Sequence, residues 1–391
     1  MRLTVLLGPF LPTPPGPGGA VEQRWYHKAR TWASWGHDVT MVSREWEGLA
    51  PSETDDAGLK HVRVPSFADS GSNKKNLLLD LRYTLRAMKR LPDADVVVTN
   101  TFWAPVVLPR LRKRAGKVAV NIARFPKGQF KLYARAGRLI AVSSAIADAV
   151  ADQAPQVLPI LNWIVNPVNA HIFTPPEGER PRSGERIIAY TGRVHPEKGL
   201  DLLLDAFARV HASHPDVKLR IFGPHAVERG GGGDAFLKEL KARAPGAPVE
   251  FMGPIYEREV LAGHLREASV YCYPSRAYLG EACPVAPLES MAVGLPPVVT
   301  DLPQFRDYVR HGENGFIFER DAPDAVDQLV GHLTTLLDDH ERSRAMGVVA
   351  REQAERHSLE HIAQRYLDEF DRMLKGESTG FEPRPVQTSI A

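Results

Sequence analysis

Short apolar runs alternate with helix-forming segments from the first residues onward, and this rhythm constrains the fold more than any other feature. In the first half the apolar runs occupy 3–8, 36–43, 93–100 and 117–122. Continuous apolar runs of this length indicate strands buried on both faces, as in a parallel sheet covered by helices on each side. The stretch 138–153 predicts a further strand that turns into a helix, with Ser144 as the expected cap. We therefore expect an α/β fold with a doubly wound parallel sheet.

The rhythm stops at 162–185 and then starts again. This stretch is rich in Pro, Asn and Gly, which indicates a linker. After it, expected strands at 186–192, 218–223, 249–253, 270–275 and 296–301 alternate with expected helices at 199–214, 234–243, 257–267 and 287–293. A chain of 391 residues also exceeds one ordinary hydrophobic core. Two domains of similar architecture are therefore expected.

The C-terminal region predicts one more helix and a flexible tail. Over 358–374 the apolar side chains fall on one helical stripe that comprises Ile362, Tyr366, Phe370 and Met373. The tail 376–391 contains Pro, Ser and Thr and is expected to be disordered.

Charge and cysteine content indicate which partners and which cellular location to expect. Residues 1–165 carry 23 Lys and Arg against 13 Asp and Glu, whereas the remainder carries 26 against 34. Opposite charge in the two halves indicates different partners, although solvated surface would give the same counts. Two cysteines do not make a disulfide framework, and no apolar run reaches the ~18–20 residues of a spanning helix. The expected location is the cytoplasm, and the run 3–8 is interpreted as a buried strand rather than a signal peptide.

Two cations lie beside a turn that follows an expected strand. In the segment YTGRVHPEKG, Gly192 ends the strand, and Arg193 and Lys198 precede a helix that begins near Gly199. Loops at this edge of a parallel sheet bind ligands. Arg and Lys there can neutralise a diphosphate and stabilise the negative charge that a departing diphosphate gains. Ordinary surface cations on a solvated loop are the alternative explanation.

Two glutamates flank a later apolar loop. Glu281 and Glu289 stand at either end of ACPVAPL, which runs into a helix beginning near Pro287. The free amides of a first helical turn bind anions, so a carboxylate beside them needs another partner. Hydroxyls of a sugar and of a ribose are suitable partners. A helix-dipole role would explain Glu289 alone but not both glutamates.

Several segments resemble those of retaining glycosyltransferases of family 4. They are TGRVHPEKG, the two glutamates in EACPVAPLE, the following SMAVGLPPVVTD, and HGENGFIFE at 311–319. The segment NPVNAHIF at 166–173 is similar to the family's linker, and GHDVTMVS with the loop at Gly18 and Gly19 matches its first domain. The resemblance covers nearly the whole chain and is strongest over 187–320.

The resemblance implies a GT-B architecture of two facing Rossmann-like domains with a cleft between them. It implies an acceptor-binding domain at 1–165, completed by a crossing helix at 358–375, and a donor-binding domain at 170–357. The donor-binding residues that it implies are Gly18, Gly19, Gly192, Arg193, Lys198, Ile255, Glu281, Val285, Ala286 and Glu289.

Within that set the resemblance implies individual roles. Arg193 and Lys198 would hold the diphosphate, Glu281 would contact the transferred sugar, and Glu289 the ribose. Arg193, Lys198 and Glu281 are the expected catalytic residues. Such enzymes need no metal or other cofactor, and retention is attributed to attack from the same face, with the leaving phosphate as the base.

Two departures from the family pattern concern the acceptor and the phosphate. The family often has a His on the first-domain strand near 121–123, where this chain has none. Asn121 or Arg124 is the expected replacement. After Glu281 the chain continues with Ala, Cys and Pro rather than Gly and Phe, and the proline removes one amide that could bind phosphate.

Two basic segments in the first half suggest a further partner. The segment 74–91 predicts a basic amphipathic helix with Leu78, Leu81, Leu85 and Met88 inward, and RLRKR at 110–114 is a second basic cluster. Both fit contact with anionic lipid head groups, and ordinary helix packing with solvated cations is the alternative. Nucleic acid is not an expected partner, because no aromatic stacking platform accompanies the charge.

The expected function is retaining, metal-independent transfer of a sugar from a nucleotide-diphosphate sugar. A UDP-sugar is favoured over GDP-mannose, and the expected acceptor is a hydroxyl of a glycan, glycolipid or small glycoside. The alternatives are a disaccharide phosphorylase of the same fold, a non-catalytic glycan- or lipid-binding scaffold, and a non-hydrolysing sugar-nucleotide epimerase.

Overall fold

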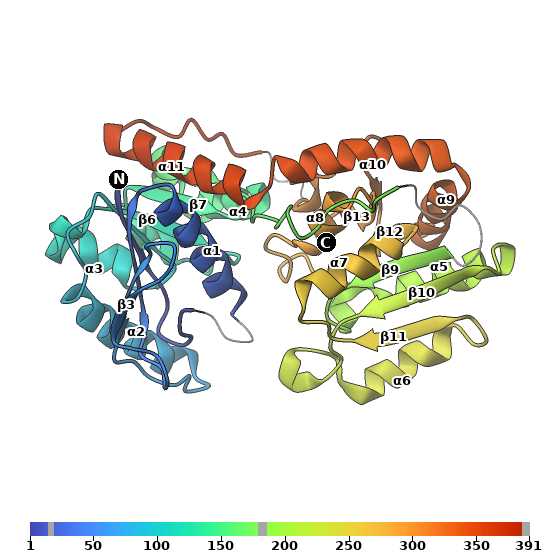
Figure 1. The fold of residues 1–391 in the computed structure, drawn as a ribbon, viewed down its shortest axis with the longest axis horizontal. Coiled ribbons are helices and arrows are strands. Elements are labelled where there is room, and N and C mark those ends of the chain that lie inside the picture. Colours follow the sequence, from blue (N-terminus) through green and yellow to red (C-terminus); the bar gives the residue numbers. More distant parts are fainter. Residues whose placement is uncertain (15–18, 179–185, 385–391) are drawn as a thin grey trace. The chain divides into compact units, whose positions relative to one another are not determined.

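The computed structural model describes residues 1–14, 19–178 and 186–384, and the chain divides into two compact units. The first unit comprises Met1–Asn166 and the chain from Leu359 onward, and the second comprises Pro167–Ser358. The sequence interpretation places these bounds at 165, 170 and 358. Each unit has a mostly parallel sheet with helices packed on it (Figure 1).

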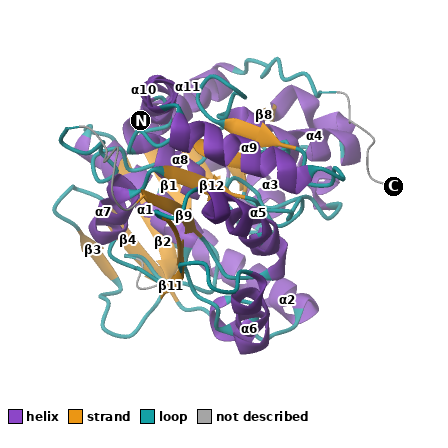
Figure 2. Ribbon diagram, turned by 90° about the vertical axis from the view of Figure 1, so that its right-hand side faces the viewer, coloured by secondary structure: helices purple, strands orange, loops and turns teal. Residues whose placement is uncertain are grey.

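The first unit contains an eight-stranded sheet. Its strands are β1 (Arg2–Leu6), β2 (Asp38–Arg44), β3 (Ser52–Thr54), β4 (Lys60–Val64), β5 (Val96–Thr99), β6 (Lys117–Ile122), β7 (Arg138–Ala141) and β8 (Leu161–Trp163). Their order is β3-β4-β2-β1-β5-β6-β7-β8, and β3 alone runs antiparallel to its neighbour. Figure 2 shows β4, β2 and β1 side by side. The central strands are buried along their length, as their continuous apolar runs predict.

Five α-helices cover this sheet: α1 (Ala20–Ser34), α2 (Asn73–Met88), α3 (Ala104–Leu111), α4 (Ser144–Gln153) and α11 (Leu359–Lys375). The last helix completes the core of the first unit, although it comes from the other end of the chain. Tyr366 and Phe370 are buried against α1, and the indole Nε1 of Trp32 donates to the carbonyl of Ala363 at 3.0 Å. The apolar stripe predicted over 358–374 is thus confirmed as a packing face.

The orientation predicted for α2 is wrong. Leu78 and Leu85 are exposed, and the buried residues of this helix are Asp80, Tyr83, Thr84 and Ala87. Asp80 fixes this rotation, because its Oδ2 accepts hydrogen bonds from the amides of Phe102 and Trp103 at 3.1 and 3.0 Å. The amides ahead of α3 require an acceptor, and the carboxyl group of Asp80 supplies it in the orientation that leaves the two leucines exposed.

The predicted cap of α4 is also shifted by one residue. Ser143 is extended, with φ −156°, and its Oγ accepts a hydrogen bond from the amide of Ile146 at 3.4 Å. Ser144 is already the first helical residue. The cap must precede the first helical turn, so Ser143 takes this role.

Part of the tail that was expected to be disordered is ordered. Gly376, with φ +79°, turns the chain after α11. The amide of Thr379 then donates to the carbonyl of Pro159 at 3.1 Å, and that of Arg384 to Oδ1 of Asp148 at 3.0 Å. These hydrogen bonds hold 376–384 on the first unit. Residues 385–391 lie outside the described residues.

The second unit contains a six-stranded parallel sheet in the order β11-β10-β9-β12-β13-β14. These strands are β9 (Arg186–Thr191), β10 (Val217–Phe222), β11 (Val249–Gly253), β12 (Val270–Tyr273), β13 (Pro297–Thr300) and β14 (Phe316–Phe318). Its helices are α5 (Leu200–Ser213), α6 (Gly233–Arg243), α7 (Arg258–Glu267), α8 (Ala286–Ala292), α9 (Ala325–Asp338) and α10 (His340–Glu355). The strands and helices predicted over 186–301 are confirmed, with small shifts at their ends. No helix among the described residues has the length and apolarity to cross a membrane.

Candidate active site

The predicted cations and the first predicted glutamate meet where the strand order of the second sheet reverses. β9 and β12 are neighbours there although many residues separate them in the chain. The loops that follow them leave the same edge of the sheet, the usual position of a ligand site in such folds. A Cβ on Gly199, which has φ +67°, would lie 2.0 Å from the carbonyl oxygen of Pro274. The two loops therefore approach so closely that only glycine fits.

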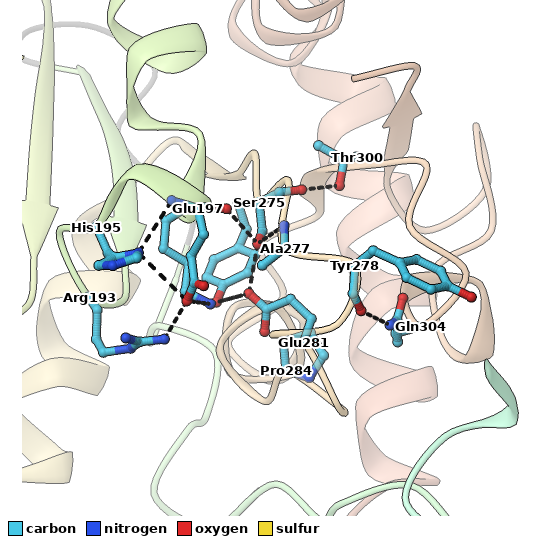
Figure 3. A network of polar contacts seen from close by, with 12 residues as sticks. Arg193, His195, Glu197, Ser275, Ala277, Tyr278, Glu281, Pro284, Thr300 and Gln304 are labelled. Carbon is cyan, nitrogen blue, oxygen red and sulfur yellow. Dashed lines mark hydrogen bonds and ion pairs between the residues drawn. The ribbon is translucent and has the colours of Figure 1, made fainter. Parts of the chain in front are cut away.

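Lys198 and Glu281 form a buried ion pair at this junction. Figure 3 shows Glu281 close to Ser275 and Glu197. Lys198 is 4% exposed and Glu281 is 5% exposed. Oε1 of Glu281 also accepts hydrogen bonds from the hydroxyls of Tyr273 at 2.9 Å and Ser275 at 2.8 Å. Burial raises the pKa of Tyr273, so its phenol stays protonated and donates to the carboxylate. The second oxygen of Glu281 has no hydrogen-bond partner within the described part of the chain.

Arg193 lies beside this pair but has a different carboxylate as its partner. Its Nη2 contacts Oε1 of Glu197, and its Nη1 donates to the carbonyl of Gly230 at 2.6 Å. The same Glu197 oxygen lies 3.7 Å from Nζ of Lys198, so one carboxylate lies between the two cations. The amide of Glu197 donates to Nδ1 of His195 at 3.3 Å, which fixes the turn in place. Arg193 is well exposed, so a ligand can reach its guanidinium.

Glu289 is paired separately, with a cation that sequence reasoning missed. It lies in the first turn of α8, is 5% exposed, and contacts Nη2 of Arg258 at the start of α7. The guanidinium of Arg258 lies 4.8 Å from the centre of the Phe173 ring. Arg258 is half-exposed, so this ion pair borders solvent.

The start of α8 offers backbone donors close to Glu281. Val285 and Ala286 precede Pro287, are partly exposed, and their amides have no hydrogen-bond partner among the described residues. Tyr308 holds the preceding loop, because its hydroxyl donates to the carbonyl of Pro284 at 2.8 Å. Ile255 lies partly buried in the loop after β11.

Of the remaining predicted residues, Gly192 directly follows β9 in the second unit, where its amide donates to the carbonyl of Phe222 at 2.8 Å, and the others belong to the first unit. Gly19 has φ +74° and precedes α1, and Gly18 lies outside the described residues. Asn121 is buried: its Oδ1 accepts from the indole of Trp25 at 3.3 Å, and its Nδ2 donates to the hydroxyl of Tyr366 at 3.4 Å. Its amide is therefore occupied by packing contacts. Arg124 is exposed in the loop after β6.

The structure thus brings Arg193, Lys198 and Glu281 into one polar network and pairs Glu289 with Arg258. Sequence reasoning missed Glu197, and the four-residue spacing between Arg193 and Glu197 was a signal that could have revealed it. The pairing of Arg258 with Glu289 had no such signal, because it depends on the fold bringing the first residue of α7 to the first turn of α8. No group of three or more His, Cys, Asp and Glu side chains in the described ranges could hold a metal ion.

The network is suited to a ligand that carries both anionic groups and hydroxyls. Two cations and two free amides can bind phosphate oxygens. The open oxygen of Glu281 can accept hydrogen bonds from hydroxyl groups. Phosphate and hydroxyl partners within one small site are the features of a sugar nucleotide.

Comparison with known proteins agrees with this geometry. The family model described as Glycosyl transferases group 1 matches residues 175–353, and that described as Glycosyltransferase Family 4 matches 17–159. A phosphatidyl-myo-inositol mannosyltransferase of Mycobacterium tuberculosis is 35% identical over 37% of this chain and 35% of its own length. A D-inositol 3-phosphate glycosyltransferase of Jonesia denitrificans is 29% identical over 52% of this chain and 50% of its own length. The chain thus spans about a third to a half of these relatives.

Solved structures with low sequence identity share the fold. Sucrose-phosphate synthase from Thermosynechococcus elongatus has a TM-score of 0.76 at 17% identity and covers 96% of this chain and all of its own. An Anabaena protein in complex with UDP and glucose has a TM-score of 0.68 at 17% identity, over 95% of this chain and 99% of its own. Because two family models account for most of the chain and the two Rossmann-like units share their fold with glycosyltransferases, the chain belongs to the family 4 glycosyltransferases of the GT-B fold.

Proposed function

We propose that this protein is a retaining glycosyltransferase that uses a nucleotide-diphosphate sugar and needs no metal ion. The observation that carries the proposal is the buried pair of Lys198 and Glu281, with Arg193 beside it at the strand-order reversal. Burying two charges is costly, and hydrophobic replacements are often more stable. The presence of this buried ion pair at the ligand-binding edge of the sheet therefore favours a catalytic role over a structural one.

In the proposed reaction the bond between the anomeric carbon and the diphosphate oxygen breaks, and a bond to the acceptor oxygen forms on the same face. The acceptor proton passes to the departing diphosphate. Lys198 and Arg193 stabilise the negative charge on the diphosphate, as fixed cations do at a developing charge. The free oxygen of Glu281 accepts hydrogen bonds from the sugar, and Glu289 from the ribose.

When the donor binds, one carboxylate must give way and another must accept a new partner. Glu197 contacts Arg193 and lies 3.7 Å from Lys198, so its charge opposes a diphosphate there. The diphosphate takes over Arg193, and Glu197 turns outward. Ribose hydroxyls likewise approach Glu289, whose present partner Arg258 stands at the solvent border.

We propose a UDP-sugar as the first donor to test and GDP-mannose as the second. Support comes from a solved neighbour bound to UDP and glucose and from a relative named a mannosyltransferase. Thermal stabilisation by UDP, GDP and ADP in EDTA distinguishes them, because a ligand at 100 times its Kd adds about 2.7 kcal/mol. A shift with one nucleotide that disappears in Arg193→Gln supports the site. No shift with any of the three contradicts the proposal.

The catalytic part of the proposal is tested by Glu281→Gln. This variant keeps the size of the side chain and removes the charge that orients the sugar and Lys198. Turnover is expected to fall at least about 100-fold, as it does when a transition-state contact is lost. Glu259→Gln, on the exposed face of α7, is the matched control and keeps full activity. Phosphate-dependent release of a sugar 1-phosphate without any nucleotide would identify a phosphorylase instead.

We further propose that the acceptor is a glycolipid on the inner face of a membrane and that the first unit rests on it through α2 and α3. Four leucines are exposed on these two neighbouring helices: Leu77, Leu78, Leu85 and Leu111. The same two helices and the residues directly after them also carry exposed cations, namely Lys74, Lys75, Arg82, Arg86, Lys89, Arg110, Lys113 and Arg114. Exposed apolar side chains and cations on the same helices suit an anionic bilayer surface. A relative named for its action on phosphatidyl-myo-inositol supports a lipid-borne acceptor.

Sedimentation with lipid vesicles tests this contact. Vesicles with anionic lipid should bind the protein and neutral vesicles should not, and the binding should weaken as salt rises. The double variant Leu78→Gln, Leu85→Gln is expected to reduce binding at least about 10-fold. Burying each leucine in the bilayer contributes on the order of 1–2 kcal/mol to the binding free energy. Val348→Gln, an exposed apolar residue on α10, is the control. Equal binding by all three proteins would contradict the proposed contact.

A further inference from the structure

A cavity lies in the first unit, at the edge of its sheet opposite to the carboxyl ends of the strands. It has a volume of about 650 Å³, and its wall includes the residues that begin β6 and β7, namely Lys117 and Arg138. β6 is six residues long, so this edge is about 16 Å from the loop that carries Arg124. A volume of this size is typical of small-ligand sites.

Cations predominate in the wall of this cavity. Lys113, Lys117, Arg135 and Arg138 line it, together with two carboxylates, Asp95 and Glu377. Both carboxylates are already paired, Asp95 with Arg2 at 2.7 Å and Glu377 with Arg372 at 3.2 Å. These two carboxylates therefore leave the positive charge of Lys113, Lys117 and Arg135 largely available to a ligand, whereas Arg138 has a carboxylate partner of its own.

Arg138 is the buried cation of the site. It is 1% exposed, and its Nε lies 2.7 Å from Oε1 of Glu369. Its Nη2 is also buried, and no hydrogen-bond acceptor for it exists among the described residues. A buried guanidinium N–H without an acceptor is unfavourable, so the side chain gains a hydrogen bond if it turns toward a ligand oxygen in the cavity.

Three further cations can contribute to binding an anion in the cavity. Nζ of Lys117 donates to the carbonyls of Met373 and Leu374 at 2.7 and 3.2 Å, at the end of α11, and an ammonium has a third N–H to give. Lys113 and Arg135 are exposed side chains at the rim. The ordered tail closes one side, because Gly376, Glu377 and Ser378 form part of the wall.

We propose that this cavity binds a small phosphomonoester, at a site separate from the donor site. A phosphate has enough oxygens to accept from Arg138, Lys117 and Arg135 together, and guanidinium groups match its geometry. The organic part of the ester lies along the apolar side of the cavity, which Pro109, Val118 and Met373 supply. α11 and β6, which supply part of this wall, lie close together in Figure 1.

Calorimetric titration of the full chain with glycerol 3-phosphate tests this proposal. Saturable binding is expected, with Kd raised at least about 10-fold in Arg135→Gln and in Arg138→Lys, because each removes a charge-assisted hydrogen bond. Lys131→Gln is the control, since Lys131 is an exposed cation of the first unit that does not line the cavity. Binding must also persist in Arg193→Gln, which disables the donor site. An unchanged Kd in Arg135→Gln, or loss of binding in Arg193→Gln, would overturn the proposal.

The source of the phosphate is distinguished by a second arm. If glycerol 3-phosphate binds, the ligand is a soluble ester. If glycerol 3-phosphate does not bind, and Arg135→Gln weakens binding to phosphatidate vesicles but not to phosphatidylglycerol vesicles of equal charge, while Lys131→Gln weakens neither, the phosphomonoester is carried by a lipid. If glycerol 3-phosphate does not bind and Arg135→Gln affects both kinds of vesicle equally, the cavity has no such function and the proposal is refuted.

Discussion

Replacing Lys198 by methionine should destabilise the second unit by about 3 kcal/mol. Removing one partner of a buried ion pair typically costs about 3–5 kcal/mol, because the other charge stays buried. Glu281 would keep its hydrogen bonds from Tyr273 and Ser275, at 2.9 and 2.8 Å, which places the expected cost at the lower end. The double variant Lys198→Met, Glu281→Gln removes both charges. It should be more stable than the sum of the single variants indicates, by about 2 kcal/mol or more.

Urea unfolding followed by two probes measures this effect in the correct unit. All six tryptophans lie at or before residue 163, so their fluorescence reports on the first unit, whereas far-UV circular dichroism reports on both. Lys198→Met is expected to lower the midpoint of the transition seen by circular dichroism while the tryptophan transition stays in place. Additive free energies in the double variant, or a cost below about 1 kcal/mol, would refute the reasoning, because such values are typical of exposed ion pairs.

Three further perturbations test other features. Glu197→Gln should tighten the binding of a nucleoside diphosphate about 3–10-fold, since it removes a carboxylate beside Arg193, and weaker binding by calorimetry would argue against the displacement of Glu197. Burial raises the pKa of Asp80 from 3.8 to about 6, so the folded state holds its proton more tightly and stability falls as pH rises from about 4 to 6. Asp80→Asn should abolish that fall, which amounts to up to about 3 kcal/mol in the free energy of unfolding measured with urea. If the free energy of unfolding keeps the same pH dependence in this variant, Asp80 is excluded as its source. Gly199→Ala should strongly destabilise the second unit, because its Cβ would overlap the carbonyl of Pro274, and a melting temperature like that of the parent would show that the loops can separate.

The sheets were predictable from the sequence because their signal is local. Each buried strand is a short apolar run, and helices between them require parallel neighbours. The antiparallel β3 escaped prediction, since it is only three residues long and fully exposed. The rotation of α2 was mispredicted for another reason. The buried Asp80 accepts hydrogen bonds from amides more than 20 residues further along the chain, and the spacing of apolar residues within a helix does not reveal such a distant partner.

The candidate site was predicted in its residue types but not in its pairings. Strand ends and glycines marked the loops that carry Lys198 and Glu281. Their direct contact depends on β9 and β12 being neighbours, which is a property of strand order and not of spacing. The expected role of Asn121 rests on its position alone and stays a prediction; in the structure its amide is bound to Trp25 and Tyr366.

The return of α11 to the first unit has a consequence for the order in which the chain can fold during synthesis. Trp25 and Trp32 of α1 pack on Tyr366, which the ribosome adds only after the whole second unit. At about 5–20 residues per second, synthesis of that unit takes about 10–40 s, and the aromatic face of α1 lacks its cover for that time. The second unit, continuous in sequence, can finish folding first. The N-terminal half of this protein is thus the last to be completed, and it is the half on which a chaperone would act.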